Sequence, residues 1–258
     1  MGPKLVRRFA ILALVAAALP AAAEDARELL VESEARHRSQ SQDYAGELTV
    51  TTREGKVRKK AWRSHREGYA GDARLLIRFL DPPEVRGVGF LSLARAGKNP
   101  DQWLYLPSMK RERRIASQDR EASFVGTDFN YEDMEEFDHT KYEVELKGEE
   151  SVGGEPCWII AARPKEKSLY ERRLLALRKT NLYLARIESF RAGEKEPAKR
   201  LELGDIAQVE GHWVARRMVM RDQKKGSHTE VVLKELGFDR PQPADRFTLQ
   251  NLNREEAD

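Results

Sequence analysis

Residues 140–148 read TKYEVELKG, and their strict alternation is the strongest indication of fold class in the chain. Tyr142, Val144 and Leu146 are apolar, whereas the residues between them are glutamates and those on either side of the set are lysines. A period of two is typical of a β-strand. A charged face that alternates with an apolar one indicates an antiparallel sheet with one solvated side. This stretch therefore predicts a strand at the surface of an antiparallel sheet.

The same pattern recurs on both sides of this stretch, separated by turn residues such as Asp81-Pro82-Pro83 and Gly153-Gly154. The further segments are YAGELTVTT (44–52), RLLIRFLDPP (74–83), GVGFLSLA (87–94), QWLYLP (102–107), CWIIAARP (157–164), RRLLALRK (172–179), LYLARIESFR (182–191), KRLELGDI (199–206), HWVARRMVMRD (212–222) and HTEVVLKEL (228–236). Together they predict a mainly β (α+β) domain of about eleven strands, at the spacing of a sandwich or barrel.

Two segments lack the alternation and are the available covers for such a sheet. Residues 24–42 predict one amphipathic helix, because Ala26, Leu29, Leu30 and Ser33 share a face at helical spacing. Residues 115–137 are irregular. A highly curved sheet needs its apolar concave face covered, so we expect the helix and this lid segment to cover it. Partial cover would leave a pocket for an apolar ligand.

The first 23 residues predict a secretory signal peptide. Lys4, Arg7 and Arg8 precede the apolar run FAILALVAAAL, and three alanines end at Ala23. We therefore expect one domain, residues 24–258, exported to the periplasm without a stable membrane anchor. The leader holds three of the 46 basic residues and none of the 43 acidic ones, so the remainder is neutral. That balance argues against a nucleic-acid partner.

No pattern in the sequence indicates catalysis, a metal site or a cofactor. The five histidines do not fall at metal-ligand spacings, and no nucleophile elbow or phosphate-binding glycine loop is present. Cys157 lies among apolar residues, which favours packing over reactivity. We predict a protein that is not an enzyme, with no catalytic residues and no metal.

Alternation gives the candidate residues for a hydrophobic cavity. They are Leu75, Ile77, Phe79, Phe90, Trp103, Tyr105, Met218 and Met220. A second set, beside the lid segment, consists of candidates for a gate, a latch or a partner contact. They are Arg111, Arg113, Arg114, Asp128, Phe129, Glu132 and Asp133. The arginines have two interpretations, which are binding of an acidic partner or lipid head group, and pairing with Asp128 and Glu132 that fixes the loop to the strand.

Several segments together resemble the outer-membrane lipoprotein-sorting protein family, relatives of the LolA and LolB carriers. The central motif is QWLYLPSMKRERRI (102–115) followed by SFVGTDFNYEDM (123–134). GHWVARRMVMRD (211–222), KGSHTEVVL (225–233) and PADRFTLQNL (243–252) resemble the last strands and the C-terminal motif of that family. The resemblance implies a half-open antiparallel β-barrel with helices at its mouth, a periplasmic location and no enzymatic activity.

Two hypotheses for function follow. The first is a periplasmic carrier that binds lipid, or the acyl chains of lipoproteins, in a hydrophobic cavity for transfer to the outer membrane. The alternative is a non-enzymatic interaction module with a closed cavity, accessory to an envelope exporter or a stress-regulatory complex. How far the lid segment fills the cavity distinguishes the two.

Overall fold

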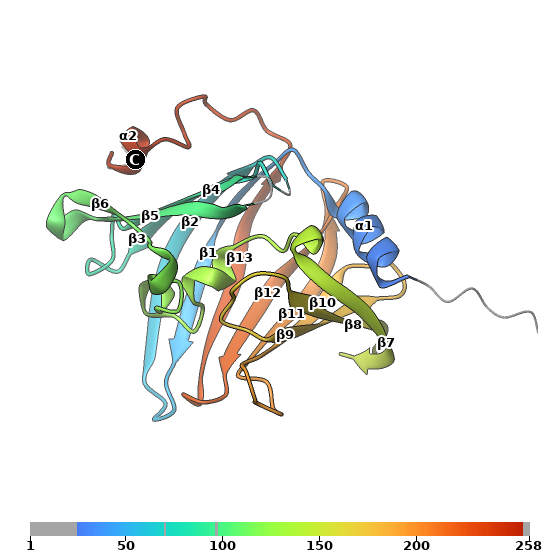
Figure 1. Ribbon diagram of the computed structural model, residues 1–258. Helices are drawn as coiled ribbons and strands as arrows, with labels where there is room; N and C mark the ends of the chain where they lie inside the picture. Colours follow the sequence, from blue (N-terminus) through green and yellow to red (C-terminus); the bar gives the residue numbers. More distant parts are fainter. Residues whose placement is uncertain (1–24, 70, 96–97, 255–258) are drawn as a thin grey trace, which may run out of the picture.

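The computed structural model describes residues 25–69, 71–95 and 98–254 and shows a single curved antiparallel sheet of 13 strands (Figure 1). The strands are β1 Ser41–Thr51, β2 Val57–Glu67, β3 Arg74–Asp81, β4 Gly89–Arg95, β5 Lys98–Leu106, β6 Arg111–Arg114, β7 Tyr142–Val152, β8 Glu155–Pro164, β9 Arg172–Arg178, β10 Leu184–Phe190, β11 Lys199–Val209, β12 His212–Asp222 and β13 Ser227–Phe238. The predicted signal peptide, residues 1–23, lies outside the described residues.

The sheet consists of two meanders joined at their centre. Its order is β6-β5-β4-β3-β2-β1-β13-β12-β11-β10-β9-β8-β7, so only the β1–β13 pair joins strands that are not neighbours in sequence. Strands β6 and β7 lie at the two edges, and the sheet is therefore open rather than closed into a barrel. The predicted mainly β, highly curved antiparallel fold is confirmed. The eleven predicted segments omit β2, in which charged residues obscure the alternation, and the four-residue β6.

The strand order requires a segment of the chain that crosses from one edge of the sheet to the other. Strands β6 and β7 follow one another in the chain but lie at opposite edges of the sheet. Residues 115–141 connect them and contain four short 3-10 turns, η2 Ser117–Asp119, η3 Phe124–Gly126, η4 Tyr131–Met134 and η5 His139–Lys141. This crossing segment passes over the concave face (Figure 1). The irregular segment predicted as a lid thus has a topological cause.

Helix α1, Ala26–His37, covers the other half of the concave face, over β8 and β9. Asp25 caps its N-terminus, and Ala26, Leu29 and Leu30 are buried against apolar residues of these strands. The hydroxyl of Ser33 donates to the Leu182 carbonyl at 2.7 Å, so the predicted helix face is confirmed. The helix ends earlier than the predicted residue 42 because β1 begins at Ser41.

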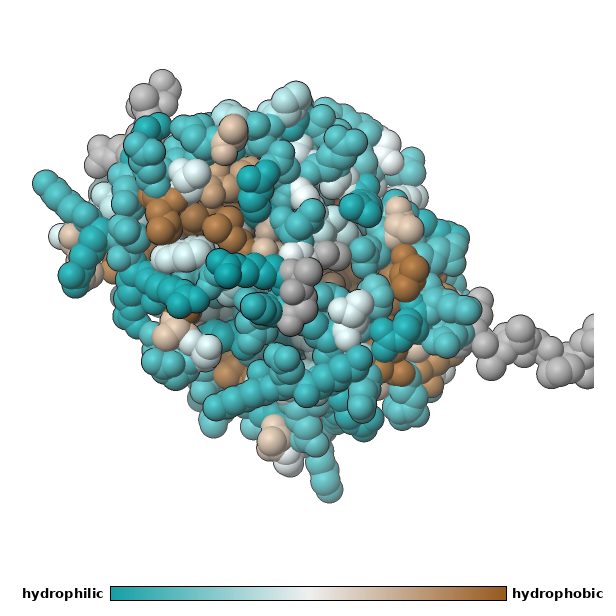
Figure 2. All heavy atoms as spheres, turned by 45° about the horizontal axis from the view of Figure 1, so that its top comes forward, coloured by the Kyte–Doolittle hydropathy of each residue, from teal (hydrophilic) through white to brown (hydrophobic). Residues whose placement is uncertain are grey.

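The C-terminal segment covers the convex face of β3 to β5. It ends in the short helix α2, Leu249–Leu252, which lies over these strands (Figure 1). Phe247 and Leu252 pack against Leu76, Leu91 and Tyr105. Strands β3 to β5 are therefore covered on both faces. Around this end of the molecule the surface is mostly hydrophilic, with small separate apolar patches (Figure 2). Among the residues that the structure describes, no helix is both long and apolar enough to cross a membrane.

Candidate ligand cavity

An open cavity of about 610 Å³ lies on the concave face, between helix α1, the crossing segment and the sheet. Its floor is apolar and comes from both meanders. The floor residues are Tyr44, Leu75, Leu175, Leu177, Leu184, Ile187, Leu203, Val214, Met218 and Leu233. Leu30, Ser33 and His37 of α1 form one wall, and residues 134–139 form another. A concave, mostly apolar site of this size is typical of a small-molecule pocket.

One wall of the cavity carries a network of paired charges. The guanidinium of Arg120 donates to Glu135 at 2.8 Å and lies 3.7 Å from Glu132. Arg173 lies 3.7 Å from Glu132 and donates to the Tyr142 hydroxyl at 3.1 Å. Burial raises the pKa of the Glu135 carboxyl, although Arg120 opposes the shift. Because these charges neutralise one another, they form a structural wall rather than a free ion-binding site.

Residues 123–134 of the crossing segment, here called the plug, fill the other half of the concave face. Phe124 is buried at the centre of this half. Its ring lies 5.9 Å from Phe79, 5.1 Å from Phe90 and 5.8 Å from Tyr131, measured between ring centroids. These separations are those of favourable aromatic pairs. The plug therefore forms a packed core with β3 and β4, and none of these four rings lines the open cavity.

Asp128 fastens the plug to β13. Its backbone N–H donates to the Thr229 hydroxyl at 2.9 Å, and its carboxylate accepts from the hydroxyls of Thr229 and Ser227. Asp128 is 3% exposed and Thr229 is fully buried. A buried carboxylate is tolerated only when hydrogen bonds replace its water shell. These bonds supply that replacement and fix the loop on the sheet.

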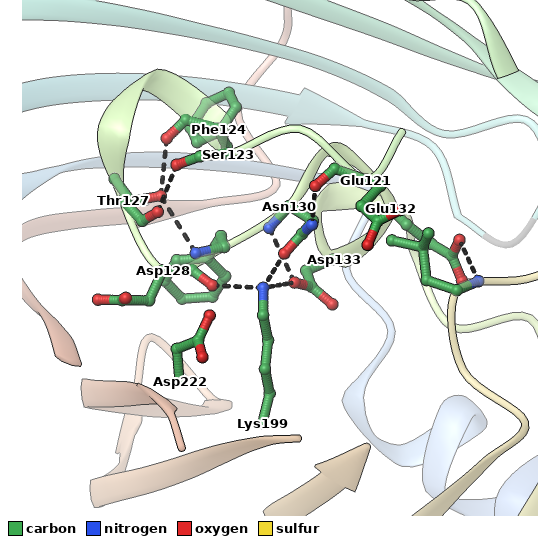
Figure 3. A network of polar contacts seen from close by, with 12 residues as sticks. Glu121, Ser123, Phe124, Thr127, Asp128, Asn130, Glu132, Asp133, Lys199 and Asp222 are labelled. Carbon is green, nitrogen blue, oxygen red and sulfur yellow. Dashed lines mark hydrogen bonds and ion pairs between the residues drawn. The ribbon is translucent and has the colours of Figure 1, made fainter. Parts of the chain in front are cut away.

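Lys199 of β11 fastens the plug at a second point (Figure 3). It is 3% exposed, and its ammonium donates to the Asp128 carbonyl at 2.6 Å, to Asp133 at 3.0 Å and to the Asn130 side chain. Three donors thus meet three acceptors, which uses the whole hydrogen-bonding capacity of the ammonium. The Tyr170 hydroxyl completes the shell of Asp133 at 2.9 Å.

A second buried lysine holds the tip of the plug and is its third fastening. The Lys60 ammonium, on β2, donates to the Val125 carbonyl at 2.5 Å. Burial lowers the pKa of Lys60, and the nearby Arg58 adds to the shift. Val125 has a φ of 46°, which is strained for a β-branched residue. The plug therefore carries polar fastenings to β2, β11 and β13.

The predicted cavity residues separate into three groups. Leu75 and Met218 line the open cavity. Ile77, Phe79 and Phe90 lie on the same concave face but beneath the plug, and Met220 is buried beside Thr229, with which it pairs in register. Trp103 and Tyr105 lie on the opposite, convex face beneath the C-terminal segment.

The placement of Trp103 and Tyr105 corrects the prediction that they face the cavity. Both faces of β5 are apolar because both are covered, so alternation gave no basis for choosing between them. The residues of β5 that do face the concave side are Gln102 and Leu104. Gln102 donates to the Tyr131 carbonyl at 3.2 Å, which ties β5 to the plug.

The predicted pairing of the arginine cluster with Asp128 and Glu132 is wrong. Arg113 pairs with Asp119 and Arg114 pairs with Asp101, and their side chains are 64% and 68% exposed. Arg111 is also exposed. The reason is position, since β6 is an edge strand, whereas Asp128 points to β13 at the centre of the sheet.

The other predicted latch residues belong to the plug itself. Phe129 packs against the core beneath the plug, and Asp133 accepts from Lys199. Glu132 is 4% exposed and accepts from Leu169 N at 3.0 Å and from the Ser168 hydroxyl. These partners lie in the second meander, and none of them belongs to the arginine cluster.

The sequence carried a signal for one partner that the prediction missed. In KRLELGDI, Lys199, Leu201 and Leu203 follow one another at intervals of two, so they share one face of the strand. The Lys199 side chain is therefore expected on the apolar face. A lysine on an apolar face needs a buried acceptor. Thr229 and Lys60 carried no comparable signal. Within the described residues, no group of three or more His, Cys, Asp or Glu side chains has the arrangement of a metal site.

Comparison with known proteins gives one family match. A family model described as "Uncharacterized protein" matches residues 71–254, which is more than half of the chain. No curated protein matches the sequence.

Solved structures confirm the fold and the predicted resemblance. A domain described as an outer membrane lipoprotein-sorting protein, from Vibrio parahaemolyticus, is 26% identical, with a TM-score of 0.83 over 88% of this chain and 97% of its own. A DUF1329 family protein from Desulfovibrio piger is 25% identical, with a TM-score of 0.83 over 87% of this chain and 96% of its own. A LolA superfamily protein from Nitrosomonas europaea, at 18% identity, has a TM-score of 0.70 over 88% and 98% and shares the fold.

Proposed function

We propose that this chain, which belongs to the family whose model spans residues 71–254, is a periplasmic carrier that binds acyl chains of lipids or lipoproteins in the concave cavity. The observation that supports the proposal is the open cavity of about 610 Å³ with its apolar floor. The relative from Vibrio parahaemolyticus, described as lipoprotein-sorting, is similar over nearly its whole length. Transfer would deliver the cargo to the outer membrane.

Binding in such a site follows from burial of methylene groups. Each methylene removed from water contributes about 0.8 kcal/mol, so a chain of ordinary length gains several kcal/mol even after the cost of ordering it. The cavity floor offers leucine, isoleucine and methionine side chains, which make dispersion contacts without demanding a fixed ligand shape. Release requires no chemistry, only a competing apolar site or movement of the wall that α1 forms.

The experiment that tests the proposal is uptake of a fluorescent acyl probe by the delipidated protein. Leu184→Trp fills the cavity from its floor and should reduce uptake strongly. Leu174→Trp is the matched control, because Leu174 is half-buried on the opposite face of β9 and does not line the cavity. Native mass spectrometry of protein purified from the periplasm should show a bound lipid. Ligand-free protein that also takes up no probe would refute the carrier function.

A second candidate function is an interaction module, and the exposed arginines of β6 favour it. Arg111, Arg113 and Arg114 lie on an edge strand, where one side of the strand has no neighbour in the sheet. Such an edge can accept a partner strand, and the arginines would select an acidic one. The partner would be a component of an envelope export or regulatory complex. Charge reversal at Arg111 and Arg113 should then abolish partner capture and leave probe uptake intact.

A further inference from the structure

Two hairpin turns project side by side from one end of the sheet, and we call them the basic tips. They are residues 51–59, where β1 turns into β2, and residues 222–227, where β12 turns into β13. The two turns are neighbours because β1 pairs with β13, and the Arg53 guanidinium joins them by donating to the Lys224 carbonyl at 2.8 Å. Both lie at the lower end of the sheet in Figure 1, away from helix α2.

The basic tips concentrate a positive charge that the chain as a whole does not have. The two segments contain six basic residues and only two acidic ones, Glu54 and Asp222. The basic residues are Arg53, Lys56, Arg58, Lys59, Lys224 and Lys225, and all of them are exposed. Their excess of positive charge is larger than the net charge of +3 of the entire chain. The charge of the protein is therefore distributed unevenly, with a local maximum at this end.

Most of this charge has no counter-charge nearby. Among the residues that the structure describes, Lys225 is the one member of the six that forms an ion pair, with Asp222 at 3.3 Å. The exposed arginines of β6 differ in this respect, because Arg113 and Arg114 each pair with an aspartate. Like charges that lie close together without counter-charges repel one another in the folded chain, and they attract anionic partners. The basic tips therefore have the electrostatic character of a binding surface for negative charge.

The composition of the basic tips favours a lipid surface over a protein partner. The tips do not line the cavity, and they contain no phenylalanine, tyrosine or tryptophan, the residues that anchor most protein interfaces. Four of the six basic residues are lysines, which are depleted at protein interfaces but are typical of segments that bind anionic head groups. Val57, which is 54% exposed between Lys56 and Arg58, adds an apolar side chain that can enter the boundary of a bilayer.

We infer that the basic tips bind an anionic lipid bilayer, such as one that contains phosphatidylglycerol, and hold the protein on it reversibly. The inference goes beyond the proposed acyl binding, because the two sites are separate. Tyr44 lines the cavity and Thr51 begins the first tip, so about 20 Å of β1 lies between them. Protein that is bound to a bilayer through its tips therefore keeps its cavity free for cargo.

The test is co-sedimentation of protein purified from the periplasm with lipid vesicles at about 0.1 M salt. Vesicles of phosphatidylcholine with phosphatidylglycerol should bind the protein, whereas vesicles of phosphatidylcholine alone should not. Raising the salt to about 1 M should release it, because the Debye length falls from about 10 Å to about 3 Å. Lys56→Gln combined with Lys59→Gln should weaken binding roughly tenfold to thirtyfold. Lys147→Gln combined with Lys234→Gln is the matched control, since it removes the same net charge at exposed positions elsewhere and should bind like the unmodified protein.

Two results would overturn the inference. One is the absence of binding to the anionic vesicles, and capture of poly-glutamate by the same tips would then assign them to an acidic protein. The other is binding that the two double variants weaken equally. Uptake of the acyl probe should be unchanged in both double variants, so failure of the membrane contact and failure of the carrier function are distinguishable.

A fluorescent label tests whether the tips are the part of the protein that meets the bilayer. Val57→Cys, labelled with an environment-sensitive fluorophore, should show a blue shift of its emission on anionic vesicles. Val31→Cys is the matched control, because Val31 is 48% exposed on helix α1, and its label should show no shift. Cys157 is buried and does not compete for the label. A shift at position 31 and none at position 57 would show that another face of the protein meets the bilayer, and would overturn the inference.

Discussion

Replacement of Lys199 by methionine tests whether the plug is held by its buried polar contacts. The substitution keeps an unbranched side chain but replaces the Cδ methylene by sulfur and removes the terminal ammonium. Asp133 then loses a partner at 3.0 Å in a position that is nearly free of water, and the Asp128 carbonyl loses its donor at 2.6 Å. Removing one member of a buried ion pair typically costs about 3–5 kcal/mol, because the remaining charge stays desolvated. We expect a loss of unfolding free energy in this range.

The assay is denaturant unfolding combined with a thermal scan. For a domain of this size each kcal/mol corresponds to about 2–4 °C, so the melting temperature should fall by about 6–20 °C. Amide hydrogen exchange should become faster in residues 123–134 before the rest of the sheet. Lys234→Met is the matched control, because Lys234 is exposed and its pair with Glu47, at 2.6 Å, is screened by solvent, so its loss should change stability much less. Equal losses in the two variants would refute the reasoning, as would unchanged exchange in the plug.

Three further predictions concern other parts of the molecule. In Gly46→Ala the new Cβ would lie 2.2 Å from the Val232 carbonyl oxygen, so the free energy of unfolding, measured by chemical denaturation, should fall by about 1–3 kcal/mol. The control is Gly204→Ala, whose Cβ would have its nearest neighbouring atom at 3.9 Å and which should change the free energy of unfolding by less than about 1 kcal/mol. Burial lowers the pKa of His37 below its usual 6.5, so as the pH falls the unfolded chain binds a proton at this residue before the folded chain does. The free energy of unfolding should therefore decrease as the pH falls below 6.5, and His37→Gln should remove that part of the pH dependence. Charge reversal at Arg111 and Arg113 should change unfolding free energy by less than about 1 kcal/mol and leave probe uptake unaltered; a large loss of either would contradict their placement at the exposed edge.

Local alternation predicted eleven of the thirteen strands, because it reports directly on which side chains meet water. The segment 140–148 is an example, since its apolar residues lie on the inner face of β7 in the observed sheet. Strand β2 shows the limit of the method. Its exposed half contains Arg58 and Lys59, and only Lys60, Trp62 and Ser64 mark the buried side. A lysine in a sequence is normally taken to mark an exposed position, so the buried Lys60 hid the alternation and the strand was not predicted.

Which face of a strand meets the cavity is a property of the whole fold. Strand β5 is apolar on both faces, and its convex face is covered by residues about 140 positions later in the chain, including Phe247 and Leu252. The buried Arg78 belongs to the same arrangement, because it donates to the Leu252 carbonyl at 2.9 Å beneath this segment. A local sequence pattern carries no information about where a segment so distant in the chain lies in the fold. The choice of Trp103 and Tyr105 as cavity residues failed for this reason.

The boundary between plug and cavity depends on strand order rather than on strand pattern. Because β6 and β7 lie at opposite edges, the chain must cross the groove once, and it fills whatever part of the groove it crosses. The fastenings by Lys60, Lys199 and Thr229 determine where that crossing rests. A chain with the same thirteen strands but without these three partners could place the segment elsewhere and enclose a cavity of different size. The size of the cavity therefore depends on a few buried polar residues that do not line it.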